Sequence, residues 1–241
     1  MPVPRLIVPG LYELELPIPL GTVNVFFILT AGGVTLIDTG YPDRGRGVLA
    51  GLHALGRAIT DVRHIIVTHH HVDHAGNVAT LQAQSDAQVW MHPLDAEQVA
   101  RGQALRPTAH SAQGWFNQLA FGVAKWLMPT TITPTAIDRQ VTDNDVIPIA
   151  GGFKVIHIPG HSAGQIGLYW PAQQTLFVAD AVMHRGKSLQ APIILEEEAV
   201  AAASLQRLDR YTFTTLCFGH GQSLTETAAA TFHRYISMNA S

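Results

Sequence analysis

The stretch IIVTHHHVDHAG, residues 65–76, places four histidines and an aspartate within six consecutive positions. An apolar run precedes the cluster and a glycine follows it, so we expect a loop between a strand and a helix. In an extended chain, residues two apart point the same way, and His69 and His71 can therefore hold one ion together. Asp73 and His74 can face a second position nearby. Imidazole nitrogens combined with a carboxylate suit zinc, and also iron or manganese.

The composition is typical of a folded globular protein. Of 241 residues, 47% are hydrophobic and 14% are charged, which is enough apolar material for a sizeable core. The net charge of −3 gives no indication of a nucleic acid or anionic membrane as partner. Cys217 is the only cysteine, so neither an internal disulfide nor a cysteine metal cage is expected. Neither a signal-peptide pattern nor an apolar stretch of about 18 residues is present. We therefore expect a soluble, cytoplasmic globular protein.

Short strands alternate with helices along the chain, as in α/β or layered αββα folds. The expected strands cover 24–29, 33–40, 64–69, 87–92, 145–161, 166–170, 175–181 and 211–221, and the expected helices 44–56, 77–84, 93–102 and 223–237. No low-complexity linker divides the chain, which favours one domain over residues 1–241. Two apolar runs that end in an aspartate, 34–40 and 175–181, indicate two pseudo-symmetric halves.

Three later residues complete the ligands that two metal ions need. His161 follows a Pro-Gly turn in VIHIPGHSAG, Asp180 ends the strand in LFVADAV, and His220 lies between glycines in LCFGHGQ. Each alone has an ordinary explanation as a turn or capping residue. All three lie at strand ends, and together with the cluster they form two three-residue sets and a bridge.

These motifs, in this order, resemble those of the metallo-β-lactamase-fold hydrolases. The similarity rests on LIDTG, THHHVDHAGN, PGHSAGQIGLY, LFVADAV and FGHG, and it extends from about residue 20 to residue 222. The resemblance implies a four-layer αββα sandwich of α+β class with the metal site at one edge, between the two sheets. It points to the glyoxalase II and lactonase-like branch.

The resemblance also implies a role for each motif residue. The first metal would be held by His69, His71 and His161, the second by Asp73, His74 and His220, with Asp180 as the bridge. Asp38 of LIDTG would fix the metal loop through hydrogen bonds. His70 occupies the variable position of the motif, and we expect it to point away from the metals.

Two divalent ions, most simply zinc with iron or manganese as alternatives, imply a metal-dependent hydrolase that uses a bridging hydroxide. Asp73 and Asp180 would be its catalytic carboxylates, and Asp73 is a candidate donor of the leaving group's proton. The sequence GHSAG, residues 160–164, fits G-x-S-x-G, but it lies within the motif that supplies His161, and a metal-bound hydroxide makes a covalent nucleophile unnecessary.

The substrate class follows from what the chain lacks. The true β-lactamases of this fold lack a bridging aspartate, which this chain has at Asp180. Only 21 residues follow His220, which does not favour the glutathione-binding extension of glyoxalase II. Met183 stands where acyl-homoserine lactonases often have tyrosine, and Gln165 replaces a usual histidine. A small ester, lactone or thioester is the expected substrate.

The segment 103–137 is particular to this chain. Trp115, Leu119, Val123 and Trp126 recur at helical spacing between Pro107 and Pro129, so we expect an inserted helix with an apolar face. That face would pack in the core, form a homodimer surface, or wall the metal site. In the third interpretation the substrate-binding residues are Trp115, Trp126, Met183 and His184.

Three other functions stay open at this point. A mononuclear iron persulfide dioxygenase uses a related scaffold with two histidines and an aspartate. A phosphodiesterase of the same fold is another alternative. A non-catalytic scaffold should have lost ligands, and this sequence has lost none.

Overall fold

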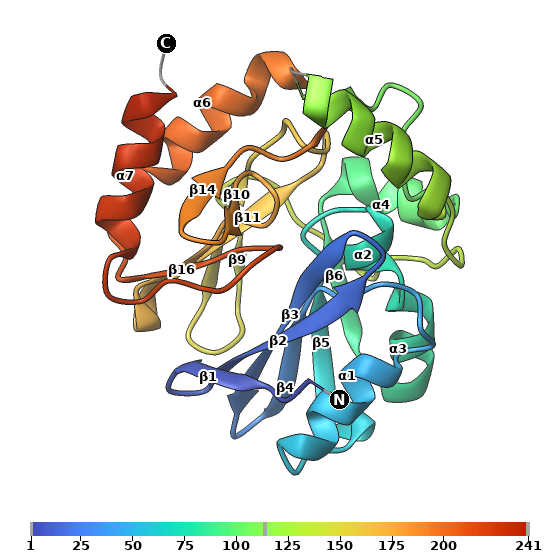
Figure 1. The fold of residues 1–241 in the computed structure, drawn as a ribbon. Coiled ribbons are helices and arrows are strands. Elements are labelled where there is room, and N and C mark those ends of the chain that lie inside the picture. Colours follow the sequence, from blue (N-terminus) through green and yellow to red (C-terminus); the bar gives the residue numbers. More distant parts are fainter. Residues whose placement is uncertain (1, 113–114, 240–241) are drawn as a thin grey trace.

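Two sheets pack face to face and carry helices on both outer sides, as Figure 1 shows. The computed structural model describes residues 2–112 and 115–239. The first sheet has the order β1 (Arg5–Val8), β2 (Leu11–Ile18), β3 (Gly21–Thr30), β4 (Gly33–Ile37), β5 (Val62–Ile66), β6 (Gln88–Met91) and β8 (Arg139–Gln140). The second has the order β16 (Thr215–Cys217), β12 (Thr175–Phe177), β11 (Ile166–Trp170), β10 (Phe153–His157) and β9 (Val146–Ile147). The predicted four-layer αββα sandwich is confirmed.

The helices divide between the two outer faces. The first sheet is covered by α1 (Arg46–Ala54), α3 (Val78–Ser85) and α4 (Pro93–Ala100), and the second by α6 (Glu198–Leu208) and α7 (Ala228–Met238). Single turns occur at α2 (Val72–Ala75), η1 (Ile59–Asp61) and η2 (Pro171–Gln173). No helix among the described residues combines the length and apolar composition needed to cross a bilayer.

Successive side chains of a strand alternate between the two faces of its sheet. One set packs against the outer helices and the other against the opposite sheet, so separate hydrophobic clusters form. In β3, Val25 and Phe27 face the outer helices, whereas Phe26 and Ile28 face the second sheet. In β10, Val155 packs between the sheets. Successive side chains of a strand point to opposite faces, so strands that are buried on both faces must be apolar throughout.

The strand ends that matter for function meet at one edge of the sandwich. β4 and β5 run parallel in the first sheet, and β12 and β16 run parallel in the second. The segments that follow β5, β10, β12 and β16, with α2 in the first of them, carry the predicted metal ligands, and Asp38 follows β4 directly. The two aspartate-ending runs of the sequence are thus β4 and β12, each paired with a parallel neighbour.

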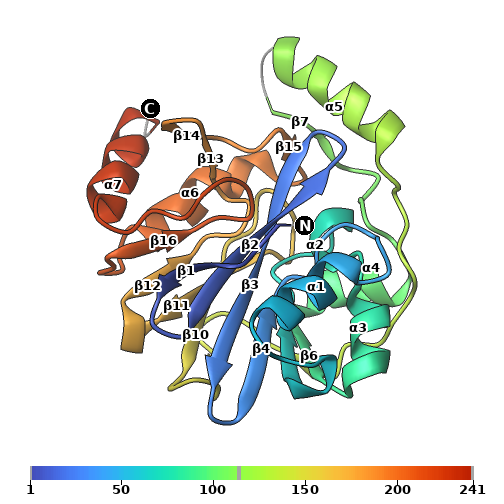
Figure 2. The same cartoon turned by 60° about the horizontal axis from the view of Figure 1, so that its bottom comes forward.

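The helix of the segment 103–137 lies at one end of the sandwich, outside the layers, whereas residues 130–137 run back along α3 and α4 (Figure 2). This helix, α5 (Trp115–Leu127), has the predicted position, and residues 113 and 114 lie outside the described residues. Below it, β7 (His110–Ser111) pairs with β15 (Ile194–Leu195), while β13 (Met183–Arg185) and β14 (Ser188–Gln190) form a small hairpin. Trp115 and Trp126 are 77% and 83% exposed, so the core interpretation of their face is wrong.

Candidate metal centre

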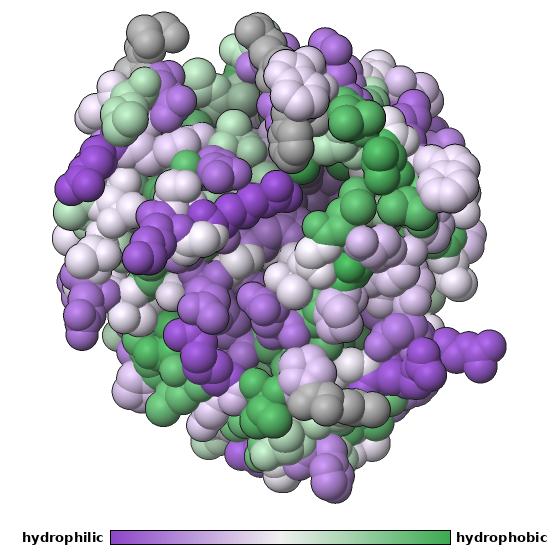
Figure 3. Space-filling view, in the orientation of Figure 1, coloured by the Kyte–Doolittle hydropathy of each residue, from purple (hydrophilic) through white to green (hydrophobic). Residues whose placement is uncertain are grey.

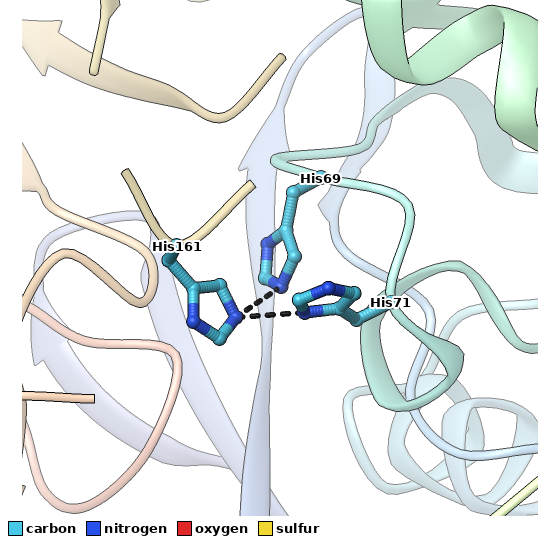
Figure 4. Close-up of side chains that lie close together, drawn as sticks. All are labelled: His69, His71 and His161. Carbon is cyan, nitrogen blue, oxygen red and sulfur yellow. Dashed lines mark hydrogen bonds between the residues drawn. The ribbon is translucent and has the colours of Figure 1, made fainter. Parts of the chain in front are cut away.

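Three buried histidines turn one ring nitrogen each toward a common point (Figure 4). His161 Nε2 lies 2.8 Å from His71 Nδ1 and 3.2 Å from His69 Nε2. His69 and His71 come from the loop after β5, and His161 comes from the loop after β10. Two sheets therefore supply a single three-nitrogen cluster.

The outward ring nitrogens of His161 and His69 show which tautomer these two histidines hold. His161 Nδ1 donates to the carbonyl of Ile194 at 2.8 Å. His69 Nδ1 lies 3.0 Å from the hydroxyl of Thr68, which itself donates to Asp38 and so accepts from the imidazole. At least these two histidines turn a lone pair inward, and facing lone pairs repel unless a cation lies among them. The donor set thus fits a divalent metal ion.

A second set lies beside the first and shares one residue with it. His74 Nε2 and His220 Nε2 lie 3.5 Å and 3.0 Å from the carboxylate of Asp180. The same carboxylate lies 3.4 Å from His161 Nε2, and Asp73 lies 3.4 Å from His220 Nε2. Asp180 therefore sits between the two sets, as a bridging ligand must. Both predicted three-residue sets can offer ligand atoms within 4.8 Å of one another.

Hydrogen bonds from the fold orient the second set. Asp38 accepts from His74 Nδ1 at 2.8 Å, and the carbonyl of Thr22 accepts from His220 Nδ1 at 2.6 Å. The side-chain oxygen of Gln165 accepts from the backbone N–H of Asp180 at 3.2 Å. Gln165 thus supports the candidate bridging residue.

A cavity of about 250 Å³ opens over these ligands. Figure 3 shows a hollow on this face with hydrophobic residues along its border on the side of α5. The floor includes His71, Asp73, His161, Asp180 and His220. The apolar walls come from Ile18, Leu20, Leu105, Ala120, Met128, Pro129, Met183, Pro192, Ile193 and Ile194.

The structure brings only two of the four predicted substrate residues to this cavity. Met183 and His184 line it, whereas Trp115 and Trp126 do not. The orientation of α5 about its axis explains this difference. It turns Ala120 and Lys125 toward the cavity and both tryptophans toward solvent. The insertion does form a wall, through residues other than its aromatic ones.

Several contributors to the site gave no signal in the sequence. The carbonyls of Thr22 and Ile194 orient His220 and His161, but any residue type supplies a carbonyl. Glu196 and Asp95 lie beside the metal loop, where they contact His70. Asp95 lies in the first turn of α4, where an acidic residue is common, so the sequence alone does not single it out.

Comparison with known proteins identifies the family. The family model of the metallo-β-lactamase superfamily matches residues 18–220, a range that holds every candidate ligand. The probable metallo-hydrolase YqjP of Bacillus subtilis (strain 168) is 23% identical over 92% of this chain and 75% of its own length. A hydroxyacylglutathione hydrolase of Jannaschia sp. (strain CCS1) is 30% identical over 68% of this chain and 49% of its own length.

Solved structures agree with this assignment. A metallo-β-lactamase family protein of Thermus thermophilus superimposes with a TM-score of 0.71 at 25% identity, covering 97% of this chain and 80% of that one. A Cronobacter sakazakii metallo-β-lactamase superimposes with a TM-score of 0.73 at 20% identity, covering 98% of this chain and 92% of that one. At this identity the similarity shows the fold alone. The chain belongs to the metallo-β-lactamase superfamily. The predicted family and enzyme class, a metal-dependent hydrolase, are confirmed.

The two ligand sets should respond differently to acid. Burial lowers the pKa of His71 to about 3 and that of His161 to about 4. Burial also opposes a proton on His74, but the Asp180 and Asp38 carboxylates outweigh it and raise the pKa of His74 well above 6.5. In His220 the Asp180 carboxylate likewise outweighs burial and raises the pKa.

We therefore expect acid to empty the second site before the first. The first-site histidines are neutral near pH 7, so an ion that binds there displaces few protons. His74 and His220 hold protons that an ion must displace, and its affinity falls as the pH falls. Metal content after dialysis at about pH 7.5 and about pH 5.5 should be close to two ions and one ion per chain. Joint loss of both ions would contradict this expectation.

Proposed function

We propose that this protein is a dinuclear metal-dependent hydrolase of small esters, lactones or thioesters. The observation that carries the proposal is the pair of ligand sets joined by Asp180 on the floor of an apolar cavity. Zinc suits these nitrogen and carboxylate ligands best, and iron or manganese would also fit.

When bound, two such ions supply a water of lowered pKa as nucleophile and Lewis-acid stabilisation of the developing oxyanion. The chain's own residues do the rest. Asp180 holds the two ligand sets in register, and Asp73 lines the cavity where a leaving group would depart. From this position the Asp73 carboxyl group can pass a proton to the leaving group. Apolar walls exclude bulk water from the reacting carbonyl.

The cavity supports an acyl-bearing substrate. Most of the residues that surround the ligands are apolar, which favours an uncharged carbon chain over a nucleic acid or a sugar. Two similar proteins are hydroxyacylglutathione hydrolases, so thioesters belong among the candidates. Each of those matches covers less than half of the relative's own length.

Metal analysis together with a substrate panel tests the proposal. The panel contains lactones, thioesters, carboxylic esters, phosphodiesters and a chromogenic cephalosporin, and oxygen uptake with a persulfide is measured alongside. We expect about two ions per chain and the fastest turnover on a carbonyl substrate. Phosphodiester cleavage well above every carbonyl substrate would favour the phosphodiesterase alternative. One iron with oxygen uptake would favour the dioxygenase.

Replacing Leu105 by alanine should weaken the preference for long acyl chains. Leu105 lines the cavity, and each lost methylene contact costs about 0.8 kcal/mol, or a few-fold in rate. The rate on a short acyl substrate should stay near the parent value because Leu105 is no ligand. The ratio of long-chain to short-chain kcat/KM measures the effect.

Trp126→Ala is the matched control for this variant, since Trp126 lies on the same segment but off the cavity. Its long-to-short ratio should equal that of the parent. If Trp126→Ala changes the ratio and Leu105→Ala does not, the assignment of the cavity wall is wrong. A shift of Trp126→Ala alone to a smaller species on a sizing column would support the homodimer interpretation of the exposed face.

A further inference from the structure

A buried polar cluster lies behind the metal-ligand loop, and the hydrolytic mechanism does not use it. His70 places Nδ1 3.1 Å from Asp95 and Nε2 3.3 Å from Glu196. The side chains of His70, Asp95 and Glu196 are at most 1% exposed. Ser162 donates to Asp95 at 2.5 Å. Buried carboxylates are costly unless they are paired and hydrogen-bonded, so this arrangement needs a reason.

The cluster reaches one of the predicted metal ligands. His71 Nδ1 turns toward His161, and the opposite nitrogen, Nε2, lies 3.5 Å from Glu196 Oε1. Among the described residues, neither this nitrogen nor Glu196 Oε1 has a hydrogen-bond partner. A carboxylate on the outward nitrogen of a ligating histidine fixes its ring and makes the inward nitrogen a stronger ligand. Glu196 is in the place where it can do this for His71.

Arg106 holds the two carboxylates together. Its Nε lies 3.0 Å from Glu196 Oε2 and its Nη2 lies 3.2 Å from Asp95 Oδ1, while Nη2 also donates to the carbonyl of Leu94 at 2.6 Å. Two neighbouring buried carboxylates repel each other, and a guanidinium that contacts both offsets the repulsion. Without it, Glu196 would be driven away from Asp95 and out of its place against His71.

The same guanidinium argues against a third metal ion in this cluster. His70, His71 and Glu196 offer atoms close enough together to hold one. The fixed charge of Arg106 on Glu196, however, repels a cation at that point. The cluster is thus a support for the metal centre.

Arg106 also connects this support to the cavity. It belongs to the segment 103–137, and the two residues before it, Ala104 and Leu105, line the cavity wall. Its side chain is 20% exposed and reaches inward to carboxylates from two other parts of the chain. The segment that walls the substrate space is therefore anchored next to the first metal site.

We propose that Arg106 is a positioning residue that holds Glu196 against His71 and thereby sets the metal affinity of the first site. The proposal rests on the metal centre of the proposed function. It extends that function by making the segment 103–137 part of the metal site's support as well as a wall of the cavity.

Zinc affinity of the metal-free protein, measured by competition with a chelator, tests this role. Arg106→Met keeps an unbranched apolar stem and removes the charged guanidinium, and it should weaken the first-site affinity about 10–100-fold. Arg106→Lys restores the charge without the planar fork and should recover most of the affinity. Arg101→Met is the control, because Arg101 pairs with Glu97 on the exposed face of α4. Cobalt substitution adds a spectroscopic measure of the coordination geometry.

The outcomes separate a positioning role from a merely structural one. An Arg106→Met protein with the parent's affinity and cobalt spectrum overturns the proposal, even if its melting temperature is lower. If Arg106→Met does not fold, Glu196→Gln decides by the same criterion, since it removes the charge beside His71 at constant size. Three zinc ions in the parent would also overturn it.

The zinc-affinity comparison can fail or succeed independently of the proposed hydrolytic function. A parent that binds two ions but hydrolyses nothing in the panel contradicts the proposed substrate class and leaves this comparison valid. A parent that hydrolyses carbonyl substrates while Arg106→Met binds zinc normally contradicts the positioning role alone.

Discussion

An Asp180→Ala protein should lose most of its hydrolytic activity, by about 10²–10³-fold in kcat, and at least one of the two proposed metal ions. The reason is the position of the carboxylate, which contacts His74 and His220 of the second set and His161 of the first. Removing it separates the two sets and leaves His74 without its inward partner. Metal content and kcat on the best carbonyl substrate measure the two effects together.

Two further variants make this expectation specific. Asp180→Asn keeps the shape of the side chain and one oxygen but removes the charge, so its activity should lie between those of the parent and the alanine variant. Asp209→Ala removes an aspartate that pairs with His233 away from the cavity, and it should keep both ions and full activity. Full metal content and full rate in Asp180→Ala would refute the bridged centre.

The candidate metal ligands could be picked out from the sequence because each follows a strand within a short local motif. His69, His71 and Asp73 lie within five positions, and a histidine or aspartate at a strand end stands out in any apolar context. The layered fold was predictable for a similar reason, since the strands are apolar on both faces. Strands β1 and β2, the short strands β7, β8, β13, β14 and β15, and helix α6 escaped prediction. Prolines interrupt the first pair, and α6 has a weak apolar pattern of mostly alanines.

The cavity wall was predictable as a helix but not in its orientation. Spacing shows that Trp115, Leu119 and Trp126 share a face, yet it gives no information on what that face meets. In the structure this face meets solvent, and the small Ala120 on another side meets the cavity. Burial of a helix face depends on tertiary neighbours, and no periodicity within the helix encodes them.

The support of the metal site depends on residues far apart in sequence. Glu196 comes from a loop 125 positions after His71, and Arg106 comes from the segment between them. A glutamate after a strand has no distinguishing local pattern. Only the fold, which closes the two sheets on each other, shows that it faces a ligand.

Gly219→Ala should damage the metal centre as severely as loss of a ligand, although glycine binds no metal. A methyl group at this position would lie 1.9 Å from Asp180 Oδ1 and 2.9 Å from His74 Cε1. The backbone cannot retreat, because Gly219 donates to the carbonyl of Ala179 and accepts from the N–H of Asn24 at 3.0 Å and 2.8 Å. The methyl group must therefore displace the Asp180 carboxylate from its place between the two ligand sets.

We expect about one ion per Gly219→Ala chain and a loss of activity of about 10²-fold or more, approaching that of Asp180→Ala. Gly122→Ala is the matched control, since a methyl group there meets nothing within 4 Å and lies in α5. Alanine in a helix interior is more stable than glycine by about 1 kcal/mol, so this control should melt slightly higher and keep both ions. A double variant, Gly219→Ala with Asp180→Ala, gives the decisive comparison. If the glycine acts only by keeping space for Asp180, the second substitution should add little to the first. If the double variant's fold-loss of activity equals the product of the losses in the two single variants, Gly219 serves the site in some other way.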